Sequence, residues 1–145
     1  MILTFLLILT PLLILVRPLQ RNRFFVLYFA AMILSAYITE RYFRVPNFSR
    51  EAFLYFIVYH LCLINLVTFI AYGTDKRAAV NGSWRIPEAN LHTLEFLGGW
   101  IGAFIGQKFF RHKNKKKSYQ AMFWLMLVLQ GVAVYIILRY LGLIH

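Results

Sequence analysis

The chain has 145 residues, of which 61% are hydrophobic and 14% are charged, and its mean hydropathy is +0.64. A soluble domain carries roughly 25% charged residues, so this composition excludes an ordinary water-soluble globule and indicates a polytopic membrane protein. The formal net charge of +11 is concentrated in short loops between apolar runs. Such loops favour membrane lipids with anionic headgroups as partners, with nucleic acid as a weaker alternative.

Four apolar segments predict transmembrane helices, because a short chain in hydrocarbon satisfies its backbone polar groups only within a helix. They are residues 2–16, 24–39, 53–72 and 119–138. We interpret the first as a retained span rather than a secretory signal, because no basic residue precedes it and no small-residue cleavage site follows it. The predicted fold class is therefore an all-α integral membrane protein, with residues 1–145 forming a single polytopic domain.

A fifth apolar stretch, residues 91–107, decides the topology. If it does not cross the membrane, twelve Lys and Arg residues lie on one side and four on the other; if it crosses, the split is seven against nine. The positive-inside rule favours the first arrangement. We therefore predict four transmembrane helices plus one re-entrant or interfacial helix, with both termini outside and residues 72–119 on the cytoplasmic side.

The same stretch carries Gly98, Gly102 and Gly106, which recur every four residues and line one helix face. Glycines at this spacing let another backbone approach closely, so we assign them to helix packing. The adjacent pair Gly98 and Gly99 leaves an alternative open, because glycine tolerates the bend that would divide the stretch into two short helices.

Two polar features interrupt the apolar segments. In the third span, Asn65, Thr68 and Tyr72 share one helix face, as expected for hydrogen bonding between helices. Glu95 lies in an apolar context, where an acid is costly unless it pairs with a cation or faces a wet cavity. We expect the partner of Glu95 to be Arg85 or Lys113. His92, one turn earlier, lies on the same helix face as Glu95.

Residues 72–119 contain acids and histidines among their basic residues, which a simple electrostatic tether would not need. The mixture therefore suggests a shaped anion-binding site, although a solvated basic face is the plainer alternative. The anion-binding candidates are Lys76, Arg85, His112, Lys113 and Lys116. The candidates for orienting these cations, or for acid/base roles, are Asp75, Glu88 and Glu95.

Known cofactor and catalytic motifs are not found in the sequence. His92, Glu95 and His112 could in principle bind a metal, but no second carboxylate is clearly placed beside them and no cysteine is near, so we predict neither a metal nor a cofactor. A Ser/His/Asp arrangement, a P-loop and a dinucleotide-binding fingerprint are not recognised.

The order and spacing of the polar residues resemble a known motif string. It consists of Tyr72 with Asp75 and Lys76, the run Arg85-Ile86-Pro87-Glu88, Leu91, Gly98-Gly99, Gly102, Gln107, His112-Lys113 and Lys116. This string resembles that of the bacterial membrane family catalogued as domain of unknown function 1294. The resemblance covers residues 72–119, about a third of the chain. It implies a multi-pass protein of the bacterial inner membrane, and no established activity comes with it.

Three function classes stay open at this stage. The chain could be a binding protein that recognises anionic lipid headgroups or a partner through its cytoplasmic face. It could instead be an integral-membrane enzyme that acts on a lipid or another amphiphile. Some members of the family resemble fusions to a cold-shock nucleic-acid-binding domain, which keeps a membrane tether for nucleic acid as the third hypothesis. The sequence does not choose between a protein partner and a homo-oligomer.

Overall fold

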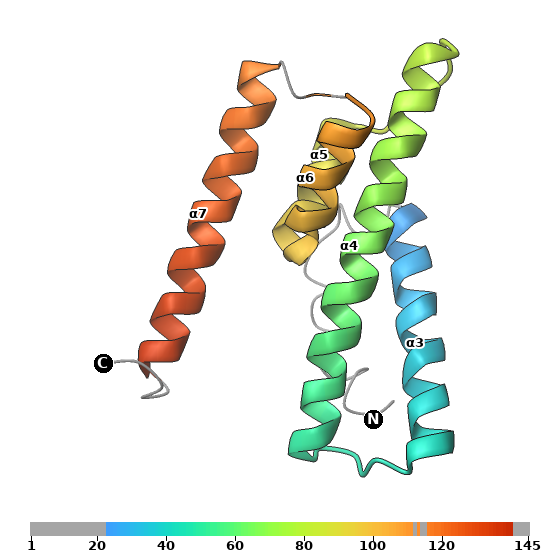
Figure 1. Ribbon diagram of the computed structural model, residues 1–145, viewed down its shortest axis with the longest axis vertical. Helices are drawn as coiled ribbons and strands as arrows, with labels where there is room; N and C mark the ends of the chain where they lie inside the picture. Colours follow the sequence, from blue (N-terminus) through green and yellow to red (C-terminus); the bar gives the residue numbers. More distant parts are fainter. Residues whose placement is uncertain (1–22, 112, 114–115, 141–145) are drawn as a thin grey trace.

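The computed structural model describes residues 23–111, 113 and 116–140, and every regular element among them is a helix (Figure 1). The all-α prediction is therefore confirmed for this part of the chain. The predicted first span, residues 2–16, lies outside the described residues, as does His112. In chain order the elements are α3 (Arg23–Phe43), α4 (Arg50–Val80), α5 (Glu88–Leu94), the π-helical turn η1 (Glu95–Gly99), α6 (Trp100–Phe109) and α7 (Lys117–Tyr140).

Three of these helices, α3, α4 and α7, are long and apolar enough to cross a membrane. They contain the spans predicted at residues 24–39, 53–72 and 119–138, and each helix is longer than the predicted span. The extension is largest in α4, whose 31 residues make a helix of about 46 Å, longer than the roughly 30 Å of a bilayer's hydrocarbon core. Consequently the last turns of α4 carry polar residues that a shorter helix would have left in a loop.

Helix α4 forms the spine of the fold, with α3 packed along it as an antiparallel neighbour (Figure 1). Ser49 caps its start, because the Ser49 side chain accepts a hydrogen bond from the Ala52 N–H at 3.0 Å. It ends at Val80, where Asn81 and Gly82 form a turn and Gly82 adopts a φ of +64°. The shared core of these helices is apolar and consists mainly of Phe25, Tyr28, Met32, Ile64 and Val67.

Residues 88–109 form a helical hairpin rather than one straight helix. Gly98 has a φ of +104°, a conformation that L side chains rarely adopt, and it reverses the chain between α5 and α6. At the turn, Gly98 lies near His60 and Ile64, in the middle of α4, whereas at the far end of α6 Phe110 reaches Gly73. The hairpin therefore penetrates to the midpoint of α4 and returns to the end from which it started.

Asn65 of α4 stabilises this reversal. Its Nδ2 donates to the Gly98 carbonyl at 3.1 Å, and its Oδ1 accepts from the Gly102 N–H at 2.7 Å. In a regular α-helix those two backbone groups would bond to each other, so one side-chain amide replaces the hydrogen bond that the Gly98 conformation removes. Asn65, one of the polar residues predicted to share a helix face in the third span, thus holds the hairpin turn against α4.

Helix α6 approaches α4 very closely. A Cβ added to Gly102 would lie 2.0 Å from the Asn65 carbonyl oxygen, and one added to Gly106 would lie 3.0 Å from the Tyr72 Cβ. At Gly98 the nearest atom would be 3.6 Å away, so its conformation rather than space requires glycine there. Gly99 takes the place of Gly98 in the contact, since a Cβ would lie 2.1 Å from Thr68 Oγ1.

Helix α7 packs on the hairpin, on the side away from α4 (Figure 1). Near its start Tyr119 and Phe123 are buried, and further along Gln130 donates to the carbonyl oxygens of Glu95 and Phe96 at 2.8 and 2.7 Å. Beyond that contact its apolar side chains, such as Val132 and Ile136, are exposed. Such a surface is suited to lipid rather than to water.

Candidate functional site

A buried polar cluster surrounds Glu95 at the start of η1. We call Tyr72, His92, Glu95, Gln107 and Tyr119 the core cluster. The hydroxyls of Tyr72 and Tyr119 both donate to Glu95 Oε1, Tyr119 at 2.8 Å, and the two hydroxyl oxygens lie 2.6 Å apart. Glu95 is 1% exposed. Its carboxyl group is therefore removed from solvent and held by neutral donors from α4 and α7.

Two glutamines extend this cluster between the helices. Gln107 Nε2 donates to the Tyr72 hydroxyl at 3.2 Å, and Gln107 Oε1 accepts from Gln120 Nε2 at 2.5 Å. Gln120 Nε2 also donates to the Lys113 carbonyl at 3.0 Å. Because α4, α6 and α7 each contribute a side chain, the network fixes the relative positions of three helices.

His92 binds the other oxygen of Glu95. Its Nδ1 lies 2.6 Å from Glu95 Oε2, and its ring stacks on Tyr119 with the ring centroids 4.2 Å apart. These two contacts fix the orientation of the imidazole. Nε2 is left without a hydrogen-bond partner among the described residues. A neutral His92 that donates through Nδ1 consequently presents an acceptor at Nε2.

A second, charged cluster lies at the end of the hairpin where α5 begins. We call Asp75, Arg85, Glu88, Lys113 and Lys116 the rim cluster. Asp75 is fully buried on the last turns of α4, where Oδ1 accepts from the Ile86 N–H at 3.0 Å and Oδ2 lies 3.3 Å from both Arg85 Nη2 and Lys113 Nζ. This acid ties the 81–87 loop and the loop after α6 to α4.

Glu88 organises the exposed part of the rim cluster. Lys116 Nζ donates to both of its carboxylate oxygens, at 2.8 and 2.9 Å, and Lys113 Nζ lies 3.7 Å from Oε1. The hydrogen bond from Lys116 lowers the pKa of the Glu88 carboxyl below its usual range, and the positive charge of Lys113 adds to this effect. Glu88 is therefore ionised at neutral pH.

Lys113 connects the two clusters. Its side chain is only 4% exposed, and its Nζ lies between Asp75 and Glu88 and 4.8 Å from the centroid of the Tyr119 ring. An ammonium group over an aromatic face is stabilised by the ring quadrupole. The tyrosine that donates to Glu95 thus also contacts the most buried cation of the rim cluster.

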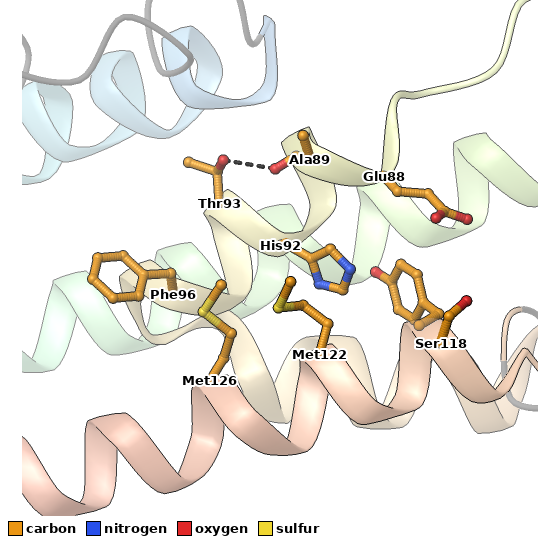
Figure 2. A pocket seen from close by; sticks show the side chains of 9 residues that line it. Glu88, Ala89, His92, Thr93, Phe96, Ser118, Met122 and Met126 are labelled. Atoms are coloured by element: carbon orange, nitrogen blue, oxygen red, sulfur yellow. Dashed lines mark hydrogen bonds between the residues drawn. The ribbon is translucent and has the colours of Figure 1, made fainter.

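A groove of about 550 Å³ opens beside both clusters, between α5–η1 and α7 (Figure 2). Figure 2 shows Glu88 and Ser118 at one end, Phe96 and Met126 at the other, and the His92 ring in the middle beside Met122. Its volume falls within the range typical of small-molecule sites. One end is polar and adjoins the rim cluster, while the other is apolar, so the groove is chemically complementary to an amphiphile.

Residues 65–119 match the profile of the family described as a protein of unknown function (DUF1294). The uncharacterized protein YsdA of Bacillus subtilis (strain 168) is 38% identical to the chain over 78 residues, which cover 54% of this chain and 88% of YsdA. The chain belongs to the DUF1294 family. No solved structure matches the chain. All residues of the core and rim clusters lie within the matched segment, so both clusters lie in the family's shared region.

Six of the eight candidate site residues lie in the two clusters. Of the anion-binding candidates, Arg85, Lys113 and Lys116 meet in the rim cluster, whereas Lys76 is half-buried on α4 and forms none of that cluster's ion pairs. The acid candidates Asp75 and Glu88 also lie in the rim cluster, and Glu95 lies in the core cluster. His112 is outside the described residues, so its anion-binding role stays an untested prediction, as does the expectation that it forms no metal site with His92 and Glu95.

The expected partner of Glu95 was wrong. Arg85 and Lys113 pair with Asp75, while Glu95 is bound by two tyrosines and His92. Prediction from sequence places His92 on the same helix face as Glu95 but assigns no role to the hydroxyl of Tyr119. It also missed the groove wall on α7, because Ser118, Met122 and Met126 look like ordinary residues of a membrane helix. The polar side chains of Gln120 and Gln130 in that helix were the available signal.

Proposed function

We propose that this protein binds an anionic amphiphile of the inner membrane, with the charged headgroup at the rim cluster and an apolar chain in the groove. The groove supports this proposal most directly, because it joins a polar end beside Lys116 to an apolar end lined by Phe96 and Met126. A soluble anion would need only the first end, and a hydrocarbon only the second. An amphiphile uses both.

The charges of the rim cluster suit an anion. Three cations and two acids leave a formal charge of +1, and the ion pairs also hold the cations in place. The side chains of Arg85 and Lys116 are 50% and 54% exposed, so each can still contact a headgroup while its acid partner orients it. We assign Lys113, which is buried, to the support of these two.

The membrane arrangement that goes with this proposal has four spans, with the α5–η1–α6 hairpin as a re-entrant element and the rim cluster on the cytoplasmic side. Two observations support it. The hairpin turns at the level of Ile64, midway along α4, and both of its ends lie beside the last turns of α4. The resulting topology also gives the twelve-to-four division of basic residues.

Cysteine accessibility in a Cys62→Ala background tests this arrangement. Single cysteines at Ser83 and at Arg111 should be labelled from the same side of sealed membranes, and one at Asn47 from the other side. Labelling of position 111 together with position 47 would show that the hairpin crosses the membrane and would refute the re-entrant arrangement.

Lipid binding can be tested by native mass spectrometry of the full chain. The amount of bound phosphatidylglycerol is compared with the amount of bound phosphatidylcholine. We expect phosphatidylglycerol to be preferred, and we expect Lys116→Gln to remove most of that preference. Lys108→Gln is the matched control, because the substitution removes the same charge away from the rim cluster. Lys108 lies on α6, with its Nζ 4.1 Å from the centroid of the Phe104 ring. Equal effects of the two variants would indicate a nonspecific basic surface, and preferential retention of nucleic acid would favour the tether hypothesis.

A further inference from the structure

The pairing of His92 with Glu95 is more than lipid binding requires. A binding groove could be lined by any polar side chain, yet here an imidazole at the groove wall is hydrogen-bonded to a carboxylate that is 1% exposed. Acids at membrane depth are expensive and usually mark a functional site. The arrangement therefore calls for an explanation in terms of chemistry.

The geometry suits a general base. With Nδ1 of His92 donating to Glu95 Oε2, the tautomer is fixed and Nε2 is the acceptor on a side chain that lines the groove. The two tyrosine hydroxyls anchor the carboxylate, and the stacked Tyr119 ring prevents the imidazole from turning. A carboxylate placed in this way also stabilises the imidazolium that forms when Nε2 takes up a proton.

The depth of His92 indicates which bond it would face. It follows Glu88 by four residues on α5, so it lies about one helical turn, or about 6 Å, deeper along the groove. The headgroup region of a leaflet is about 5 to 8 Å thick. An amphiphile with its anionic headgroup at the rim cluster would therefore place the linkage between headgroup and chains at His92, with the chains beside Phe96, Met122 and Met126.

We infer that the protein hydrolyses a carboxylic ester of an anionic glycerophospholipid, with His92 as the general base. Nε2 takes a proton from a water molecule while the water oxygen bonds to the ester carbonyl carbon. The acyl C–O bond then breaks, and the proton on Nε2 passes to the departing alkoxide. The products are a fatty acid and a lysophospholipid, and no proton passes to Glu95. This inference rests on the proposed function, because the rim cluster must first hold the headgroup.

The test uses the purified full chain in nanodiscs of phosphatidylglycerol and phosphatidylethanolamine, prepared in water enriched in ¹⁸O. We expect mass spectrometry to detect free fatty acid carrying one ¹⁸O atom, together with the matching lysophospholipid. Loss of a general base typically lowers a rate by about 100-fold or more, so His92→Gln should reduce fatty acid release by at least that factor. Glu95→Gln should do likewise, because its amide can donate to Nδ1 and so select the wrong tautomer.

His60→Gln is the matched control, because His60 of α4 contacts Tyr28 of α3 at 2.7 Å and does not line the groove. It should release fatty acid at the rate of the unmodified chain. Binding of phosphatidylglycerol, measured in parallel, should persist in His92→Gln and so separate lost chemistry from lost folding.

Binding without any release of fatty acid by the unmodified chain would overturn the inference and leave the proposed function intact. Release that is unchanged in His92→Gln, or release of the phosphorylated headgroup in place of fatty acid, would overturn it too. A chain that does not bind phosphatidylglycerol at all would refute both proposals.

Discussion

The core cluster and the rim cluster are each built around a buried acid, and the acid has a different kind of partner in each. Asp75, on the last turns of α4, is surrounded by a backbone N–H, Arg85 and Lys113. Glu95, at the inner end of α5, is surrounded by two hydroxyls and an imidazole. Long cationic side chains from loops reach the first acid, whereas only residues on packed helices reach the second. The position of each acid, beside the loops or near the hairpin turn, therefore determines which side chains can reach it.

This difference makes the core cluster the more vulnerable of the two. Replacing Glu95 with Leu would leave the Nδ1 of His92 and the hydroxyls of Tyr72 and Tyr119 without their acceptor, and each buried group so abandoned costs about 1–3 kcal/mol. We expect Glu95→Leu to lose most of its folded yield in mild detergent, while Glu95→Gln, which keeps an acceptor oxygen, retains more. Size-exclusion profiles and thermal unfolding measure this. Equal behaviour of the two variants would show that the hydrogen bonds to Glu95 do not stabilise the fold.

The close contact of α6 with α4 holds the core cluster together, and it can be altered without touching a polar side chain. Gly102→Ala would bring a Cβ within 2.0 Å of the Asn65 carbonyl, and such overpacking typically costs about 1–3 kcal/mol. Gly131→Ala on α7 is the matched control, because a Cβ there meets nothing within 4 Å. We expect a lower thermal unfolding midpoint for Gly102→Ala and an equal or higher one for Gly131→Ala. A similar midpoint for both would mean that α6 can move away from α4 at little cost.

Filling the groove should separate ligand binding from the stability of both clusters. Met122→Trp places a bulkier side chain in the groove. Leu125→Trp is the control, because Leu125 is also on α7 but is exposed and does not line the groove. We expect Met122→Trp to weaken binding of phosphatidylglycerol by about tenfold, equivalent to about 1.4 kcal/mol, with little change in unfolding temperature. Titration into detergent-solubilised protein measures the affinity. Unaltered affinity in Met122→Trp would remove the groove from the binding site.

The smallest expected effect concerns the pH dependence of the rim cluster. Because Lys116 lowers the pKa of Glu88 in the folded state, the ion pair stabilises the fold fully above the ordinary carboxyl pKa of 4.5, and this stability is lost as the pH falls through the lower folded-state pKa. Glu88 is 40% exposed, so we expect at most about 1 kcal/mol. Unfolding midpoints of the wild type and Glu88→Gln at pH 7 and pH 3 measure this contribution. The two chains should differ less at pH 3, and a constant difference would contradict the assignment.

The sequence predicted the three long helices, because apolar length is a local pattern, and its candidates included the five residues of the rim cluster together with Lys76, which forms none of that cluster's ion pairs. Apolar length located α3, α4 and α7, and the glycine pair at 98 and 99 allowed the hairpin turn. The two tyrosine partners of Glu95 could not be predicted, because they depend on how α4 and α7 pack against the hairpin, whereas His92 follows from local helix spacing. The same holds for the amide of Asn65, whose role depends on the Gly98 conformation, and for Gln130, which reaches backbone carbonyls 34 and 35 residues earlier.

Photo-crosslinking tests most directly whether one amphiphile occupies both the rim cluster and the groove. A phosphatidylglycerol probe with a diazirine in its acyl chain would be incorporated into nanodiscs with the full chain, irradiated and mapped by peptide mass spectrometry, alongside a phosphatidylcholine probe with the same chain. We expect the phosphatidylglycerol probe to label peptides containing Phe96, Met122 or Met126 in preference to α3, and we expect Lys116→Gln to abolish this preference. Equal labelling of α3, α4 and α7 by both probes would contradict it.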